Sequence, residues 1–105
     1  MYTKFMNYTI NNVTVTKYRY TNAIAIQLEN RTEGPIATAT VNIPDTTTSI
    51  DEIIVDTNNC GNEIIDWLYD NKFIISKTPT RWTHSGYCSY PIFKVDMAVI
   101  YSNMC

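Results

Sequence analysis

Four side chains of this chain could together supply the groups used in hydrolytic chemistry. His84 and Ser85 are adjacent, while Asp56 and Cys88 stand elsewhere, so a base, a nucleophile and an orienting acid are all represented. Adjacent residues of an extended chain point in opposite directions, which makes a His84–Ser85 pair poorly suited to proton transfer. We therefore expect no catalytic residues and predict that the protein is not an enzyme.

Metal and redox chemistry are also disfavoured by the residue counts. The chain has one histidine, and its three cysteines, Cys60, Cys88 and Cys105, include no C-x-x-C spacing. We expect no metal site and no cofactor. The cysteines are read as reduced intracellular thiols, with Cys105 exposed and able to cross-link two copies in air.

Two dense polar and aromatic stretches, Val55–Asn59 (VDTNN) and Ser85–Pro91 (SGYCSYP), stand out because neither is periodic. Residues so poorly suited to a core lie where the backbone needs special geometry or where a surface meets a partner. The aromatic and cationic side chains in and before the second stretch have the composition of protein interfaces. The predicted binding residues are Asp56, Asn58, Asn59, Arg81, Trp82, His84, Ser85, Tyr87 and Tyr90.

A purely structural role for both stretches stays open. Asp56 is better suited to accept backbone donors at a turn than to act as a base. In the second stretch Gly86 would permit a tight turn, Cys88 would pack as a small hydrophobe, and Tyr90 with Pro91 would lead into an edge strand.

The length and the net charge limit the classes of protein to which this chain could belong. The 105 residues predict one domain spanning positions 1–105, large enough to fold without disulfides or metal. A net charge of −2 and 17% charged residues argue against sequence-independent nucleic-acid binding. No apolar run reaches the length of a signal peptide or a membrane span, so we expect a cytoplasmic protein with no membrane partner.

The first half of the chain is predicted to form strands. β-branched and aromatic residues place strands at 13–20, 23–28 and 36–43, with 30–35 as a turn, and these three should form an antiparallel meander. A loop follows at 44–49, and 53–55 is a short buried strand.

One helix is predicted, from about Gly61 to Tyr69. Ile64, Ile65, Leu68 and Tyr69 share one helical face, Asn58 or Asn59 would cap the start, and Asn71 would end the helix in the left-handed conformation. The segment 73–75 returns to the core. Residues 76–89 lack periodicity and predict a long loop. Residues 90–100 predict a final strand, with Pro91 marking either an edge or the first residues of the strand. The fold class is therefore α+β, a small antiparallel sheet of about five strands with one short helix packed across it.

The succession 25–28, 37–44, 55–59 and 85–91 resembles a family known as a domain of unknown function, found in small proteins of phages, plasmids and conjugative elements of Firmicutes and Bacteroidetes. The resemblance covers roughly residues 13–97, and the VDTNN and SGYCSYP motifs are its specific part. Thr80-Arg81-Trp82-Thr83-His84 stands where a Gly-rich approach to the second motif would be expected. The resemblance implies an accessory or host-takeover protein of a mobile element and no particular chemistry.

Two classes of function follow as expectations, with a structural phage protein as a third. In the first, the protein is an anti-defence inhibitor of the anti-CRISPR type that binds a host defence enzyme through the loop from Pro79 to Tyr90. In the second, it binds or sequesters a nucleotide-like small molecule between the Asp56–Asn59 turn and the aromatic loop. Stacking on a base would require Lys77, Arg81 and Lys94 to converge on the phosphates.

Overall fold

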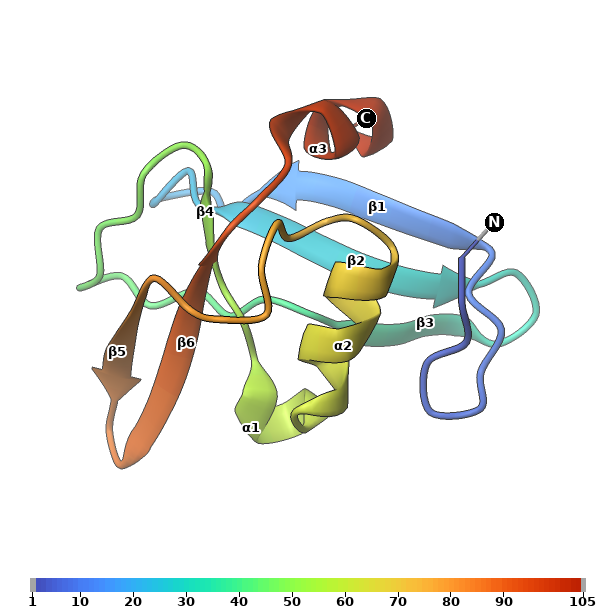
Figure 1. Cartoon of the computed structure of the whole chain (residues 1–105), viewed down its shortest axis with the longest axis horizontal. Helices are drawn as coiled ribbons and strands as arrows, with labels where there is room; N and C mark the ends of the chain where they lie inside the picture. Colours follow the sequence, from blue (N-terminus) through green and yellow to red (C-terminus); the bar gives the residue numbers. More distant parts are fainter. Residues whose placement is uncertain (1, 105) are drawn as a thin grey trace.

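The computed structural model describes residues 2–104, so the expectation for Cys105 lies outside the described residues. The elements follow one another as shown in Figure 1: β1 (Asn12–Lys17), β2 (Ile24–Asn30), β3 (Gly34–Thr38), β4 (Glu52–Ile54), α1 (Thr57–Cys60), α2 (Glu63–Asp70), β5 (Arg81–Ser85), β6 (Cys88–Lys94) and α3 (Met97–Asn103).

The predicted antiparallel meander is confirmed as the first sheet, in the order β1-β2-β3. Apolar residues alternate along β1 and β2, and those on one face are buried. The predicted bounds were wrong in three places. Residues 18–20 leave β1 as a turn, Gly34 and Pro35 belong to β3, and β3 ends at Thr38 because the chain then changes partner.

That change of partner joins the two halves of the fold. Ala39 donates its N–H to the Ile26 carbonyl of β2, and Val41 donates to the Ile54 carbonyl of β4. Thr40 between them forms a bridge with Val55 and is buried. A segment of three residues therefore leaves the first sheet and enters the second.

The second sheet has the order β4-β6-β5, with all pairs antiparallel. The prediction that Pro91 marks an edge or the first residues of a strand was wrong, since Pro91 lies in the middle of β6, which is the central strand. Proline is tolerated because β4 ends at Ile54, just before the position opposite Pro91. Val55 donates its N–H to the Pro91 carbonyl, and the Val55 carbonyl accepts from Thr57 instead of from the donor that proline lacks.

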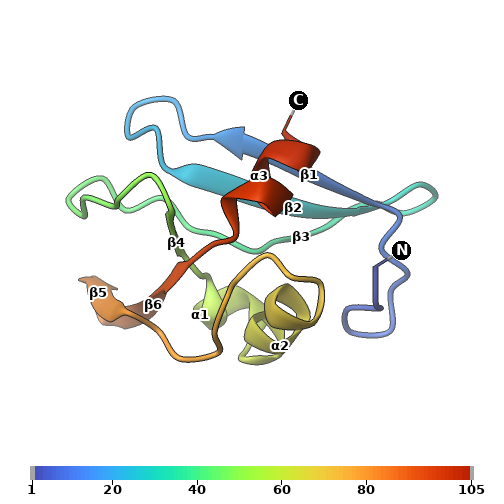
Figure 2. The same ribbon diagram turned by 45° about the horizontal axis from the view of Figure 1, so that its top comes forward.

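Residues 2–104 form three short helices where one was expected. The predicted helix corresponds to α2, which lies across the first sheet in Figures 1 and 2 and buries Ile64, Trp67 and Leu68. Tyr69 is exposed instead, so the predicted apolar face was partly wrong. The left-handed residue that follows α2 is Lys72, with φ +69°, and not Asn71.

The third helix, α3, was predicted as the end of a strand. Asp96 caps its start by accepting a hydrogen bond from the Ala98 N–H, which turns the apolar run after Val95 into a helix. This helix lies along β1, where Met104 bridges to Val15 (Figure 2).

The fold class is α+β, with two small antiparallel three-stranded sheets in place of one sheet of about five strands. The main core lies between the first sheet, α2 and α3, and a second small cluster of Ile43, Ile54, Tyr90 and Ile92 lies on one face of the second sheet. Among residues 2–104, no helix is long and apolar enough to cross a lipid bilayer.

Candidate binding surface

The segment predicted as a long loop contains a β-hairpin. Residues 81–85 pair with 88–92 around a two-residue turn, in which Gly86 has φ +60°. A glycine with positive φ at the first turn position is the signature of a type II′ turn, which suits the twist of paired strands. Gly86 thus makes the tight turn that the structural interpretation of SGYCSYP required. The hairpin projects to the lower left in Figure 1.

Residues that are directly opposite in an antiparallel pair share one face of the hairpin. Trp82 lies opposite Pro91, and His84 lies opposite Ser89. We call the face formed by these two pairs, together with Tyr87 of the turn, the hairpin face. The opposite face carries Tyr90, Cys88 and Ile92 into the second hydrophobic cluster.

The hairpin face is exposed to solvent except at Pro91, which is fully buried. Trp82 is 57% exposed, and Tyr87 at the turn has a relative exposure of 109%. His84 Nδ1 and Ser89 Oγ are 2.8 Å apart and share a hydrogen bond across the strands. Two large rings and an imidazole are therefore held in water on a hydrogen-bonded scaffold.

Two of the predicted binding residues are used by the fold. Tyr90 is only 8% exposed and packs in the second cluster. Arg81 lies on the same face as Tyr90, where its Nη2 donates to Glu52 Oε1 at 3.0 Å and to the Thr47 carbonyl at 2.6 Å. Cys88, half-buried beside the cluster, packs as the small hydrophobe that was expected.

Glu52 is the buried partner in this network. Its carboxylate also accepts from the Ser49 N–H and the Thr80 hydroxyl. The hydrogen bond from Arg81 is the main cause that lowers the pKa of Glu52, and the bond from Ser49 adds to it while burial acts in the opposite direction. The cation of Arg81 therefore anchors β5 to β4 and to the loop before it.

The VDTNN motif forms a helix start. Asp56 is buried and caps α1 by accepting from the Asn59 backbone N–H at 3.1 Å and from Asn59 Nδ2 at 2.9 Å. Asn58 or Asn59 was predicted to cap the helix that corresponds to α2, and this was wrong: the N-cap of α2 is Asn62, whose side chain makes no capping hydrogen bond, and both asparagines lie within α1. Asn58 is exposed on α1. Burial, and then the charge of Asp56, raises the pKa of the Cys60 thiol to about 11.

The predicted site residues are thus only partly brought together. Trp82, His84 and Tyr87 share the hairpin face, Ser85 lies on the other side of β5, and Asp56 with Asn59 are occupied at the cap of α1. Four surface cavities of the part of the chain that is described, 2–104, are lined by residues other than the nine candidates. One of them, between the β1–β2 turn and α3, was not foreseen from the sequence because α3 was read as a strand.

The geometry offers little for catalysis at the hairpin. The hydrogen-bond partner of His84 is Ser89 and not Ser85, and this pair is exposed to water. Within residues 2–104, no three His, Cys, Asp or Glu side chains are grouped so that they could hold a metal ion.

Comparison with known proteins gave one match. The family model described as "Domain of unknown function (DUF4313)" matches residues 12–105. No curated protein and no solved structure matches the chain.

Proposed function

The chain belongs to the family described as a domain of unknown function (DUF4313), which confirms that it is a member of an uncharacterised family, and we propose that it acts by binding a protein partner through the hairpin face. The observation that carries this proposal is the exposure of Trp82 and Tyr87 on a rigid hairpin. Aromatic side chains are enriched among the residues that dominate binding energy.

The hairpin is suited to binding because its other face is already packed. Tyr90 and Ile92 anchor it in the second hydrophobic cluster, and Arg81 ties it to Glu52. Side chains held on such a scaffold lose little conformational entropy when a partner arrives. The partner would therefore meet a surface that is largely preorganised.

The open edge of β5 offers a second means of contact. β5 is the last strand of its sheet, and within residues 2–104 no strand pairs with its outer side. Ser85 and Cys88 close a two-residue turn and therefore form a hydrogen-bonded pair. Hydrogen-bonded pairs alternate along an antiparallel ladder, so Thr83 and Arg81 also direct their N–H and C=O groups toward β6. The N–H and C=O groups of Trp82 and His84 point outward, away from β6. An extended segment of the partner could add to this edge as a further strand.

The biological role that we propose is an anti-defence protein of a phage or other mobile element, acting in the cytoplasm of a bacterial host by inhibiting a host defence protein. Small size, acidic balance and the resemblance of the two motifs to mobile-element proteins support this role. The proposal includes no catalytic step and no sequence-independent contact with nucleic acid.

The test is affinity purification from lysates of candidate bacterial hosts, followed by binding assays with purified variants of the chain. Trp82→Ala combined with Tyr87→Ala should abolish capture of the partner while the melting temperature stays nearly unchanged, since both rings are exposed. Tyr20→Ala is the matched control, because Tyr20 is 89% exposed and lies in the turn after β1. Capture that survives the double substitution, or is lost equally in the control, would refute the hairpin face as the binding surface.

A proline at position 84 tests the contribution of the strand edge. The N–H of residue 84 points away from β6, so His84→Pro removes an outward donor and leaves the ladder within the hairpin intact. His84→Ala removes the same side chain and keeps the donor. If a partner strand adds to β5, the proline variant should bind the partner far more weakly than the alanine variant. Equal binding by the two variants would show that the partner contacts side chains only and that no strand is added.

A further inference from the structure

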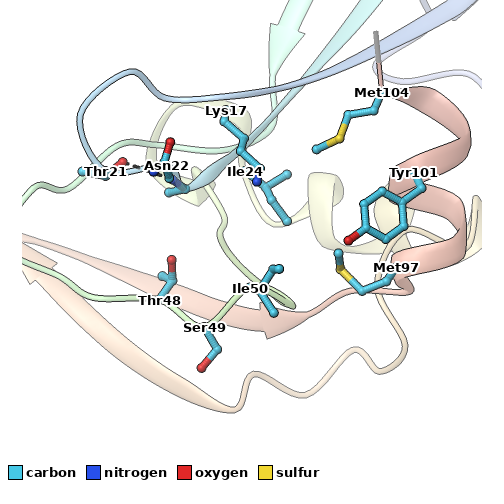
Figure 3. Close-up of a pocket in the computed structure, with 11 residues that line it drawn as sticks. Lys17, Thr21, Asn22, Ile24, Thr48, Ser49, Ile50, Met97, Tyr101 and Met104 are labelled. Atoms are coloured by element: carbon cyan, nitrogen blue, oxygen red, sulfur yellow. Dashed lines mark hydrogen bonds between the residues drawn. The ribbon is translucent and has the colours of Figure 1, made fainter.

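A cavity of about 270 Å³ lies between the turn that joins β1 to β2, the loop before β4, and α3 (Figure 3). It shares no residue with the hairpin face. Tyr101 and Met97 point from α3 toward Ile24 and Ile50 in Figure 3. The residues that line it are Lys17, Thr21, Asn22, Ala23, Ile24, Thr48, Ser49, Ile50, Met97, Tyr101 and Met104.

The wall that Ile24, Ile50 and α3 form is apolar and incompletely covered, while the rest of the lining is polar. Ile50 is 70% exposed and Tyr101 is 59% exposed, while Met97 and Met104 are half-buried. Covering the exposed part of the Ile50 side chain is favourable because it removes apolar surface from water. The two thioethers are flexible and polarisable and make favourable contacts with aromatic rings. Such walls favour a flat apolar body.

Among residues 2–104, one charged group lines the cavity. Lys17 at the end of β1 is paired in register with the buried Ile24, so its side chain leaves the sheet beside the apolar wall. With the other described residues, 2–104, Lys17 forms no ion pair, whereas Lys77, Arg81 and Lys94 each have an acidic partner. Thr48 and Asn22 add polar side chains to the lining. A cavity with an apolar wall and a cation at its rim suits an anion with an apolar body.

We propose that this cavity binds a small aromatic anion, a single ring that bears a carboxylate or a phosphate. The ring would lie against Tyr101 and the methionine side chains, and the anionic group would accept hydrogen bonds from the Lys17 ammonium. The volume is just below the roughly 300 Å³ at which pockets for drug-sized ligands begin, which restricts the ligand to a smaller molecule. This inference is independent of the proposed function of the hairpin face.

The experiment is a titration of ¹⁵N-labelled protein followed by NMR, with benzoate, phenyl phosphate, benzamide and inorganic phosphate as probes. Benzoate and phenyl phosphate should shift the amide signals of Ile24, Ile50 and Tyr101 in a saturable manner. Benzamide has the ring without the charge and should bind about fivefold more weakly, the value of one partly exposed ion pair. Inorganic phosphate has the charge without the ring and should leave these signals in place.

Variants assign the charge preference to one residue. Lys17→Gln should lower the affinity for benzoate to the affinity for benzamide. Tyr101→Ala should lower the affinity for both benzoate and benzamide. Lys72→Gln is the matched control, since Lys72 lines a different cavity beside α2. Because Lys17 and Tyr101 are both exposed, the two variants should keep the NMR spectrum of the folded protein, which the same titration records. Equal affinity for benzoate and benzamide, unchanged binding by Lys17→Gln, signal shifts from inorganic phosphate alone, or no shifts at millimolar probe would each overturn the proposal.

Discussion

Substitution of Arg81 by glutamine should destabilise the fold, although Arg81 was predicted from the sequence as a binding residue. Its guanidinium donates to Glu52, whose side chain is 8% exposed, and to the Thr47 carbonyl. A hydrogen bond to a charged group contributes about 1.5–3 kcal/mol. Because the Arg81 side chain is 45% exposed, solvent screens part of this interaction, and we expect a loss of about 1–2 kcal/mol.

A loss of this size should lower the melting temperature by about 5–12 °C for a domain of this length. The assay is thermal unfolding followed by circular dichroism at neutral pH. Lys77→Gln is the control, because the Lys77–Asp66 ion pair is exposed on both sides and should leave the melting temperature almost unchanged.

The dependence on pH adds a second readout. Arg81 lowers the pKa of Glu52 in the folded state, so the stabilisation is fully present above the unfolded pKa of about 4.3 and is lost as the pH falls through the lower folded pKa. The unsubstituted protein should therefore lose stability below about pH 4, and Arg81→Gln should lose less over the same range. If Arg81→Gln has the same melting temperature as the unsubstituted protein at neutral pH and loses only partner binding, the structural role argued for Arg81 is wrong.

Three further outcomes are expected. Asp56→Ala should lower the free energy of unfolding by about 1–2 kcal/mol, because it removes the hydrogen-bond acceptor at the start of α1. Asp56→Asn should lower it less, because one side-chain oxygen remains for the Asn59 N–H. Chemical denaturation measures both values, and equal losses would contradict the capping role of Asp56. Tyr90→Ala should lower the melting temperature far more than Trp82→Ala, since only the first ring is buried, and the reverse order would place Trp82 in the core. Cys60 should resist alkylation by iodoacetamide at pH 8 and react after denaturation, because burial raises its pKa to about 11; rapid reaction of the native thiol, identified by peptide mass spectrometry, would contradict this.

The first sheet could be predicted from the sequence because its signal is local. Val13, Val15, Ile26 and Leu28 alternate with polar residues, and alternation determines which face is buried. The end of β3 could not be predicted in this way. Thr38 is followed by residues with the same strand-like pattern, and only the change of partner from β2 to β4 ends the pairing.

The hairpin and α3 were missed for two physical reasons. β5 is an edge strand with nearly every side chain exposed, so it has no apolar periodicity, and its signal was the glycine of the turn at position 86. The apolar run before and after Asp96 resembles one long strand, but the Asp96 side chain caps a helix. Without α3, the cavity that contains Tyr101 and Met97 could not be assembled from the sequence.

The two-sided construction of the hairpin also bears on how this protein can evolve. Positions 82, 84 and 87 lie in water, while the hydrophobic anchor of the same strands is on the opposite face. Substitutions at such positions change the free energy of folding by only about half a kcal/mol in either direction. Successive variants could therefore exchange one set of surface side chains for another without passing through an unfolded intermediate. A protein under selection to bind a changing partner would keep the residues of its hydrophobic clusters and exchange only the exposed side chains at these positions.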